Sequence, residues 1–287
     1  MRAIAIIARL TIAEAASRRI LWVLLALTLI SVLLTSWGID RLVSIARAEG
    51  GVNEIEIQVG VSQVLILVAF MFSFVLAMTA AFLGAPSIAA DLESGVAHAM
   101  LARPIRRADL VVGRWVGLVA IVIAYAALSG LLEMGAVRLI SGYLPPQPLA
   151  AVAFLSAQAV VLLTFAMLLS TRLPAIASGA VCVVLFGLGW MAGVLAGVAS
   201  ALGVDALRSV AEVSRWILPT DGLWRGVIYG LEPPLVVMIA AGRAGALAEA
   251  NPFYATAPPS MVFVAWSVLW MVLVLGAATW WFERRDL

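Results

Sequence analysis

The side chains that most often carry out chemistry are scarce in this sequence of 287 residues. It contains one histidine, His98, and one cysteine, Cys182, and all 18 of its basic residues are arginine. A single cysteine excludes an internal disulfide, and this pair cannot build a zinc cluster or an HExxH site. A chain without lysine also lacks the GxxxxGK[ST] phosphate loop and a Schiff-base amine. We therefore expect no catalytic residue, no metal ion, no bound cofactor and no ATP hydrolysis in this chain.

An intramembrane hydrolase that uses His98 is the weakest alternative, because such enzymes need clustered groups such as serine with histidine or paired carboxylates. His98 stands alone in a charged segment, and no ionisable residue falls near the middle of an apolar run. Glu133 and Arg138 lie at the outer end of one run. Ion pumps and secondary transporters usually carry charge inside the membrane, so this pattern argues against them as well.

The composition is that of a membrane protein. The chain is 64% hydrophobic and 12% charged, whereas soluble domains are about half apolar and about a quarter charged. A spanning helix needs about 20 mainly apolar residues. Six runs meet this need, and they cover residues 20–37, 64–83, 111–132, 149–170, 174–202 and 261–282. The expected fold class is all-α and polytopic, a single transmembrane domain over residues 1–287.

The arginines predict the orientation, because positive residues concentrate on the cytoplasmic side. Six spans place four short arginine-bearing segments on the same side, including both termini, and the other arginines lie on longer loops among acidic residues. We therefore expect both termini in the cytoplasm and a multi-pass protein of the cytoplasmic (inner) membrane of a prokaryote. The first span lacks an Ala-x-Ala cleavage site, so we expect it to remain as an anchor.

Three segments outside the spans carry further patterns. Residues 1–19 predict a helix at the membrane surface, or a charged tail that only sets topology. Residues 84–110 predict a short cytoplasmic helix, a break at Pro104 and a long membrane helix, which together project a charged knob. A loop that only sets topology is the alternative for this knob, although its acidic residues are not needed for that. Residues 203–258 predict a helical external segment, with a surface helix through Trp216 and a re-entrant or external packing helix over Leu235–Ala248.

Glycines recur every four residues in the fifth span, at Gly189, Gly193 and Gly197. This spacing puts three small residues on one helix face and lets another backbone approach closely. The face predicts either a dimer or moving interface, or ordinary packing within the chain. Gly113 and Gly117 form the same pattern at the start of the third span.

Four motifs occur in a fixed order along the chain. The first is Ala8-Arg9-Leu10-Thr11-Ile12-Ala13-Glu14 with Arg18-Arg19, which resembles the opening connecting helix of permease subunits of the ABC type-2 exporter family (type V fold). The second resembles that family's D-x-E-x-G…P-x-x-R…G-K-x-x-G stretch, with Arg114 in place of the usual lysine, and comprises Asp91-Leu92-Glu93-Ser94-Gly95, Arg103-Pro104-Ile105-Arg106-Arg107 and Gly113-Arg114-Trp115-Val116-Gly117.

The other two motifs lie in the second half. Pro219-Thr220-Asp221…Arg225 resembles the N-P-x-D…R element of permeases from the nitrous-oxide-reductase maturation branch, with Leu218 in place of asparagine. The end, Trp281-Phe282-Glu283-Arg284-Arg285-Asp286-Leu287, resembles the family's F-x-R-R-D-L tail. The resemblance covers nearly the whole chain.

The resemblance implies the permease subunit of an ABC exporter, which forms the substrate pathway as a homodimer or heterodimer in the lipid bilayer. Separate cytoplasmic ATPase subunits would use ATP and Mg, and no nucleic acid takes part. The coupling helix that contacts the ATPase would cover roughly Ala90–Leu101. The implied contact residues are Asp91, Glu93, Gly95, Arg103, Pro104, Arg106 and Arg107. The implied external gate residues are Pro219, Asp221 and Arg225.

A membrane scaffold or assembly protein without transport activity is the alternative function, because it would share the six spans and the lack of catalytic groups. Association with an ATPase subunit distinguishes the two. The exported substrate stays open among lipids, peptides, antibiotics, polysaccharide precursors and sulfur species.

Overall fold

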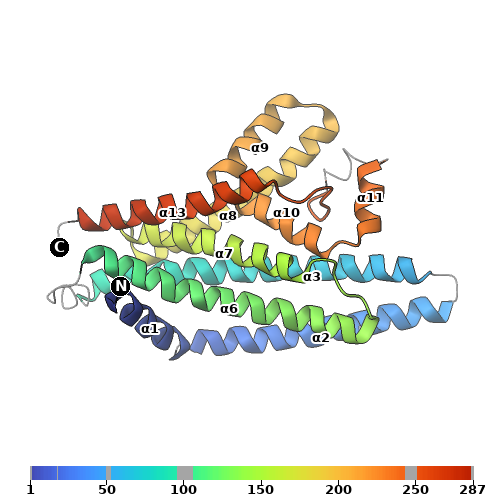
Figure 1. Cartoon of the computed structure of the whole chain (residues 1–287), viewed down its shortest axis with the longest axis horizontal. Helices are drawn as coiled ribbons and strands as arrows, with labels where there is room; N and C mark the ends of the chain where they lie inside the picture. The colour runs from blue at the N-terminus through green and yellow to red at the C-terminus, as the bar shows by residue number, and fades with distance from the viewer. Residues whose placement is uncertain (1, 18, 50–52, 96–105, 243–250, 286–287) are drawn as a thin grey trace.

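A computed structural model of the chain describes residues 2–17, 19–49, 53–95, 106–242 and 251–285. Every regular element within these ranges is a helix. Figure 1 shows long helices lying side by side along one axis, with a helical hairpin projecting from one side.

Six helices are long and apolar enough to cross a membrane, which confirms the six predicted spans. They are α2 (Arg19–Glu49), α3 (Glu54–Gly84), α6 (Arg107–Ser141), α7 (Pro148–Ser170), α8 (Ala175–Leu202) and α13 (Met261–Glu283). The apolar runs underestimate their lengths, because a helix continues wherever its residues allow it. The 35 residues of α6 extend about 50 Å at 1.5 Å per residue, beyond the roughly 30 Å hydrocarbon core.

The two chain termini lie at the same end of the bundle (Figure 1). Two hydrogen bonds link other segments to this end: the Arg107 guanidinium donates to the Arg285 carbonyl oxygen, and the Arg285 guanidinium donates to the Thr171 carbonyl oxygen. The arginine-bearing segments that the sequence places on one side therefore do gather at one end. We call it the arginine-rich end.

A short helix, α4 (Pro86–Glu93), follows α3 after a bend at this end. The bend is close-packed, because a Cβ added at Gly84 would lie 2.9 Å from the Leu163 carbonyl oxygen of α7. Pro86 occupies the first turn of α4, where its missing N–H costs nothing. Gly95 ends the segment in the left-handed conformation, with φ of 76°. The coupling helix predicted over Ala90–Leu101 overlaps the last turn of α4, and residues 96–105, with His98, lie outside the described residues, so its extent stays a prediction.

Three short helices fill most of the predicted external segment. They are α9 (Asp205–Ile217), α10 (Thr220–Leu231) and α11 (Pro234–Gly242). The predicted surface helix through Trp216 is α9, which runs back along α8. By contrast with α9, ten of the twelve residues of α10 are buried, and the helix packs against α3, α7 and α8. The re-entrant or cap character of residues 203–258 stays a prediction. The predicted helix over Leu235–Ala248 ends as α11 at Gly242 within the described residues.

Candidate functional site

The N-terminal helix α1 (Arg2–Ser17) packs along the first turns of α6, where two glycines let the helices come close. A Cβ added at Gly113 would lie 2.7 Å from the Ile7 Cβ, and one at Gly117 would lie 2.8 Å from the Ala8 carbonyl oxygen. Larger residues at either position would therefore push α1 away. The glycine pair singled out in the sequence thus has α1 as its partner, and the segment is more than a charged tail.

Arg114, between these glycines, joins three segments at the arginine-rich end. Its guanidinium forms an ion pair with Asp91 of α4 and lies 4.0 Å from the Glu14 carboxylate of α1. The side chains of Arg114 and Asp91 are only 12% and 16% exposed. Their attraction is therefore less screened by water than that of a surface pair. We call Glu14, Asp91 and Arg114 the inner junction.

A second cationic side chain at this end caps the last spanning helix. Arg107 Nη1 donates to the carbonyl oxygens of Glu283, at 3.1 Å, and Arg285, at 2.7 Å. A positive charge stabilises the last carbonyls of a helix, because they form the negative end of its dipole. Arg107 therefore positions the end of α13 against the start of α6.

The residues implied as ATPase contacts fall into two groups. Asp91 and Arg107 are engaged within the chain, as described above. Glu93, Gly95 and Arg106 are exposed at the two borders of the gap in the described residues. Arg103 and Pro104 lie outside the described residues. Among the described residues of this implied set, the exposed ones are thus Glu93, Gly95 and Arg106, and a role of any of them in contacting an ATPase stays a prediction.

A second group of charges lies on α9 and α10. The Asp221 carboxylate, 6% exposed, accepts a hydrogen bond from Arg215 Nε at 2.7 Å, and Arg225 Nε lies 3.6 Å from the same oxygen. Asp221 stands in the first turn of α10, where a negative charge suits the helix dipole. We call Arg215, Asp221 and Arg225 the outer triad. It ties α9 to α10 across the turn at Pro219, itself buried.

The predicted glycine face of α8 receives this turn. A Cβ added at Gly193 would lie 2.0 Å from Asp221 Oδ1, and one at Gly189 would lie 3.3 Å from Thr220 Oγ1. Gly197 is buried on the same helix. Gly189 and Gly193 therefore serve packing within the chain, while a role of this face in a dimer stays a prediction.

The outer end of α10 is fixed by buried polar groups. Glu232 is 1% exposed, and its carboxylate accepts a hydrogen bond from the Ala255 N–H at 3.3 Å. The Tyr143 hydroxyl donates to the Leu231 carbonyl oxygen at 2.6 Å. Burial raises the pKa of Glu232 to about 7. Burial, and then the neighbouring Glu232 charge, also raise the pKa of Tyr143.

Comparison with known protein families identifies the family of this chain. The family model described as "ABC-2 family transporter protein" matches residues 5–287. The chain belongs to the ABC-2 transporter family. The resemblance given by the four motifs is thereby confirmed, whereas the nitrous-oxide-reductase branch stays a prediction. No curated protein matches the sequence.

Membership makes the chain a multi-pass membrane protein and a permease component of an ABC transporter, a type of protein that works with an ATPase subunit. Permeases of this family are normally non-enzymatic. In the described part of this ABC-2 permease, no three His, Cys, Asp or Glu side chains gather where a metal ion could bind.

Sequence reasoning missed the insertion of α10 into this ABC-2 permease, although a signal was present. Gly222, Gly226 and Gly230 recur every four residues, as in a packing face. A Cβ added at them would lie 2.3 Å from the Phe263 ring, 2.6 Å from the Phe154 ring and 3.0 Å from the Gln147 carbonyl oxygen. The three glycines thus admit α10 between α7 and α13.

Two charged residues were also missed in the sequence. Arg215 was noted only as part of a surface helix, and nothing in the sequence pairs it with Asp221 across a proline. Glu133, expected at the outer end of a span, is only 3% exposed inside the bundle, because α6 continues to Ser141.

Proposed function

We propose that this ABC-2 permease is the transmembrane subunit of an exporter, that it forms the substrate pathway as a dimer, and that separate cytoplasmic ATPase subunits drive it. The inner junction carries this proposal. It fixes a short helix at the arginine-rich end to α6, which continues to the opposite end of the bundle. A force applied to α4 by a partner therefore acts directly on a spanning helix.

The arrangement suggests how ATP-driven closure of the ATPase pair moves the permease. The partner binds beside Glu93 and Arg106 and pushes on α4. Because Arg114 also lies beside Glu14, α1 and α6 move together with α4. The bend at Gly84 separates this movement from α3, which is packed tightly on α7 there.

The outer part supplies the gate in this proposal. α10 is buried among the outer parts of three spanning helices, and the outer triad links it to α9. A shift of α8 changes the packing contact between Gly193 and Asp221, and thereby the position of α10. Pro219, Asp221 and Arg225 would then act in opening an exit for substrate, which makes export the direction we propose.

The test is charge reversal on the exposed residues of the inner end. The permease is co-expressed with its ATPase subunit and purified through a tag on the permease. We expect Glu93→Arg combined with Arg106→Glu to lose most of the bound ATPase and the ATP-driven transport in proteoliposomes. Arg41→Glu, at an exposed site on α2 near the opposite end, is the matched control and should keep both.

Full ATPase binding and transport in the double variant would show that α4 is not the docking element. If no ATPase subunit is retained even by the unchanged chain, the alternative of a scaffold protein without transport activity is favoured instead.

A further inference from the structure

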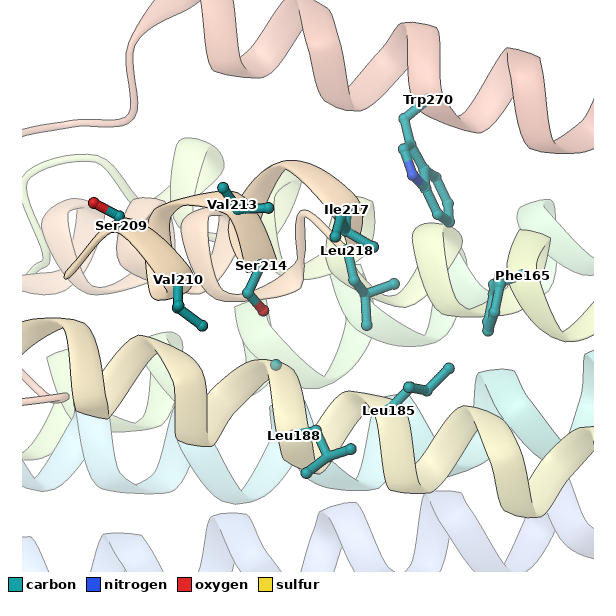
Figure 2. Close-up of a pocket in the computed structure, with 11 residues that line it drawn as sticks. Phe165, Leu185, Leu188, Ser209, Val210, Val213, Ser214, Ile217, Leu218 and Trp270 are labelled. Atoms are coloured by element: carbon teal, nitrogen blue, oxygen red, sulfur yellow. The ribbon is translucent and has the colours of Figure 1, made fainter. Parts of the chain in front are cut away.

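Glu133 of α6 is an acidic residue that the chain itself encloses. It is 3% exposed, and it lines a void of about 20 Å³, which we call the Glu133 void. By contrast, the cavity of about 510 Å³ between α8 and α9, whose walls Figure 2 shows, has no ionisable residue in its lining. Because this one chain already buries Glu133, the lipid or a second copy can only bury it further.

Four other helices contribute the surroundings of the Glu133 side chain. The hydroxyl of Thr35 on α2 lies beside the carboxyl. Apart from Glu133, the residues that line the void are all apolar, and they come from α6 itself and from α3, α7 and α10. Phe72 of α3, Val152 of α7 and Leu231 of α10 are among them. The carboxyl therefore lies in a setting with little capacity to stabilise a charge.

No cation in the described part of the chain compensates Glu133. It takes part in none of the ion pairs found there, and neither carboxyl oxygen has a partner at hydrogen-bond geometry. Arg138 on α6 and Arg41 on α2 are both exposed. Glu232, at the end of α10, is engaged with the Ala255 N–H instead. A negative charge buried without a cation costs far more free energy than a protonated carboxyl does.

The size of the Glu133 void limits what could neutralise the carboxyl. Ligand sites usually occupy about 300–1,000 Å³, whereas this void has room for about one water molecule. Ions such as Ca²⁺ take about 6–8 oxygen ligands. The side chains here offer the two oxygens of Glu133 and the hydroxyl of Thr35. The species that fits both the space and the chemistry is a proton.

We propose that Glu133 is a proton-binding site of this permease, and that its proton is required for α6 to pack against α2, α7 and α10. Ionisable residues inside a membrane bundle usually mark proton or ion sites. The neutral acid needs no cation, and its O–H can donate to the Thr35 hydroxyl. A movement that lets water reach Glu133 lets the proton pass to that water, and the helices repack only after a proton returns.

Infrared spectroscopy tests the proposal, because the C=O stretch of a protonated carboxyl is separate from the bands of carboxylates. The full chain is measured in dodecyl maltoside, a detergent without carbonyl groups. The pH is set to 9, above the pKa of about 7 of Glu232, so that this group and acids in water are ionised. We expect a protonated-carboxyl band to remain at this pH.

Variants assign this band to one residue. Glu133→Gln, which has nearly the shape of the protonated acid, should abolish it. Glu54→Gln, at an exposed site at the start of α3, is the matched control and should keep it, as should Glu232→Gln. Glu133→Asp retains a carboxyl and should shift the band, which assigns it even where the glutamine variant does not fold. Circular dichroism checks the helix content of each variant.

Three results would overturn the proposal. Absence of the band at pH 9 would mean that Glu133 is ionised in the folded chain. A band that persists unchanged in Glu133→Gln would belong to another carboxyl. A band that appears only after treatment with EDTA would mean that a metal ion occupies the site. None of these results bears on the proposed transport function, because the spectra need no ATPase subunit.

Discussion

Arg114 is the residue on which α1, α4 and α6 converge, and its charge is nearly enclosed by them. We expect Arg114→Ala to destabilise the chain by at least about 1–3 kcal/mol, because it leaves the carboxylate of Asp91 largely shielded from water without its cation. Arg114→Lys should restore much of the loss. Thermal unfolding of the purified chain measures the change, and Arg106→Ala, at an exposed site, should alter the midpoint little.

Glu232 makes stability depend on pH. Its pKa is about 7 in the folded chain and 4.5 ordinarily, so between these values the folded chain holds a proton that the unfolded chain has lost. Stability from this group is complete below pH 4.5 and is lost as the pH rises through 7, with a slope of at most about 1.4 kcal/mol per pH unit.

Glu232→Gln imitates the protonated form and should flatten this part of the pH profile. Above pH 7 the variant should unfold at a higher temperature than the unchanged chain, with Tyr143 and the Ala255 N–H still beside it. A profile that stays as steep in the variant would assign the pH dependence to another group. Melting curves across this pH range provide the measurement.

The sequence and the family resemblance identified several of these residues but not their partners. Asp91, Asp221 and Arg225 stood out in short motifs, whereas their contacts depend on how close α1, α8 and α9 come. Such approaches are set by packing between segments far apart in the chain, as with Arg107 and the last residues of α13.

At the scale of helices, α8 contains one closely packed glycine and one with open space around it, which can be compared directly. Gly193 faces Asp221, whereas a Cβ added at Gly187 would meet nothing within 4 Å. We expect Gly193→Ala to cost about 1–3 kcal/mol by overpacking the outer triad. Gly187→Ala should instead stabilise by about 0.5–1 kcal/mol, because it removes backbone freedom from the unfolded chain. Thermal unfolding of the two variants should therefore shift in opposite directions, and shifts of the same sign would contradict the close contact.

The apolar runs predicted the spanning helices well, because about 20 apolar residues in succession have few other uses. The runs could not predict where α3 begins, ten residues earlier at Glu54, because a polar first turn lies outside the core. They also could not reveal α10, since twelve residues with three glycines resemble a loop when the neighbours Phe154 and Phe263 are unknown.

The whole molecule has an arginine-rich end and an opposite end, and their sides of the membrane can be tested with cysteines. The native Cys182 is fully buried, so it should react little with a membrane-impermeant maleimide. We expect the maleimide to label Arg41→Cys in spheroplasts with an intact cytoplasmic membrane. It should label Glu93→Cys only after that membrane is permeabilised. The reverse pattern would invert the orientation on which the proposed ATPase contact depends.

The packing of α1 on α6 has a consequence for biosynthesis. Ile7 and Thr11 pack on Gly113 and Gly117, which emerge from the ribosome about a hundred residues later. At about 5–20 residues per second, α1 spends roughly 5–20 s without its partner helix. During that interval the side chains that later face α6, Ile7 and Ala8 among them, lack their cover, and a helix of this kind can lie in the lipid headgroup layer. We therefore expect the same helix to act first as a tether of the nascent chain and later as part of the inner junction.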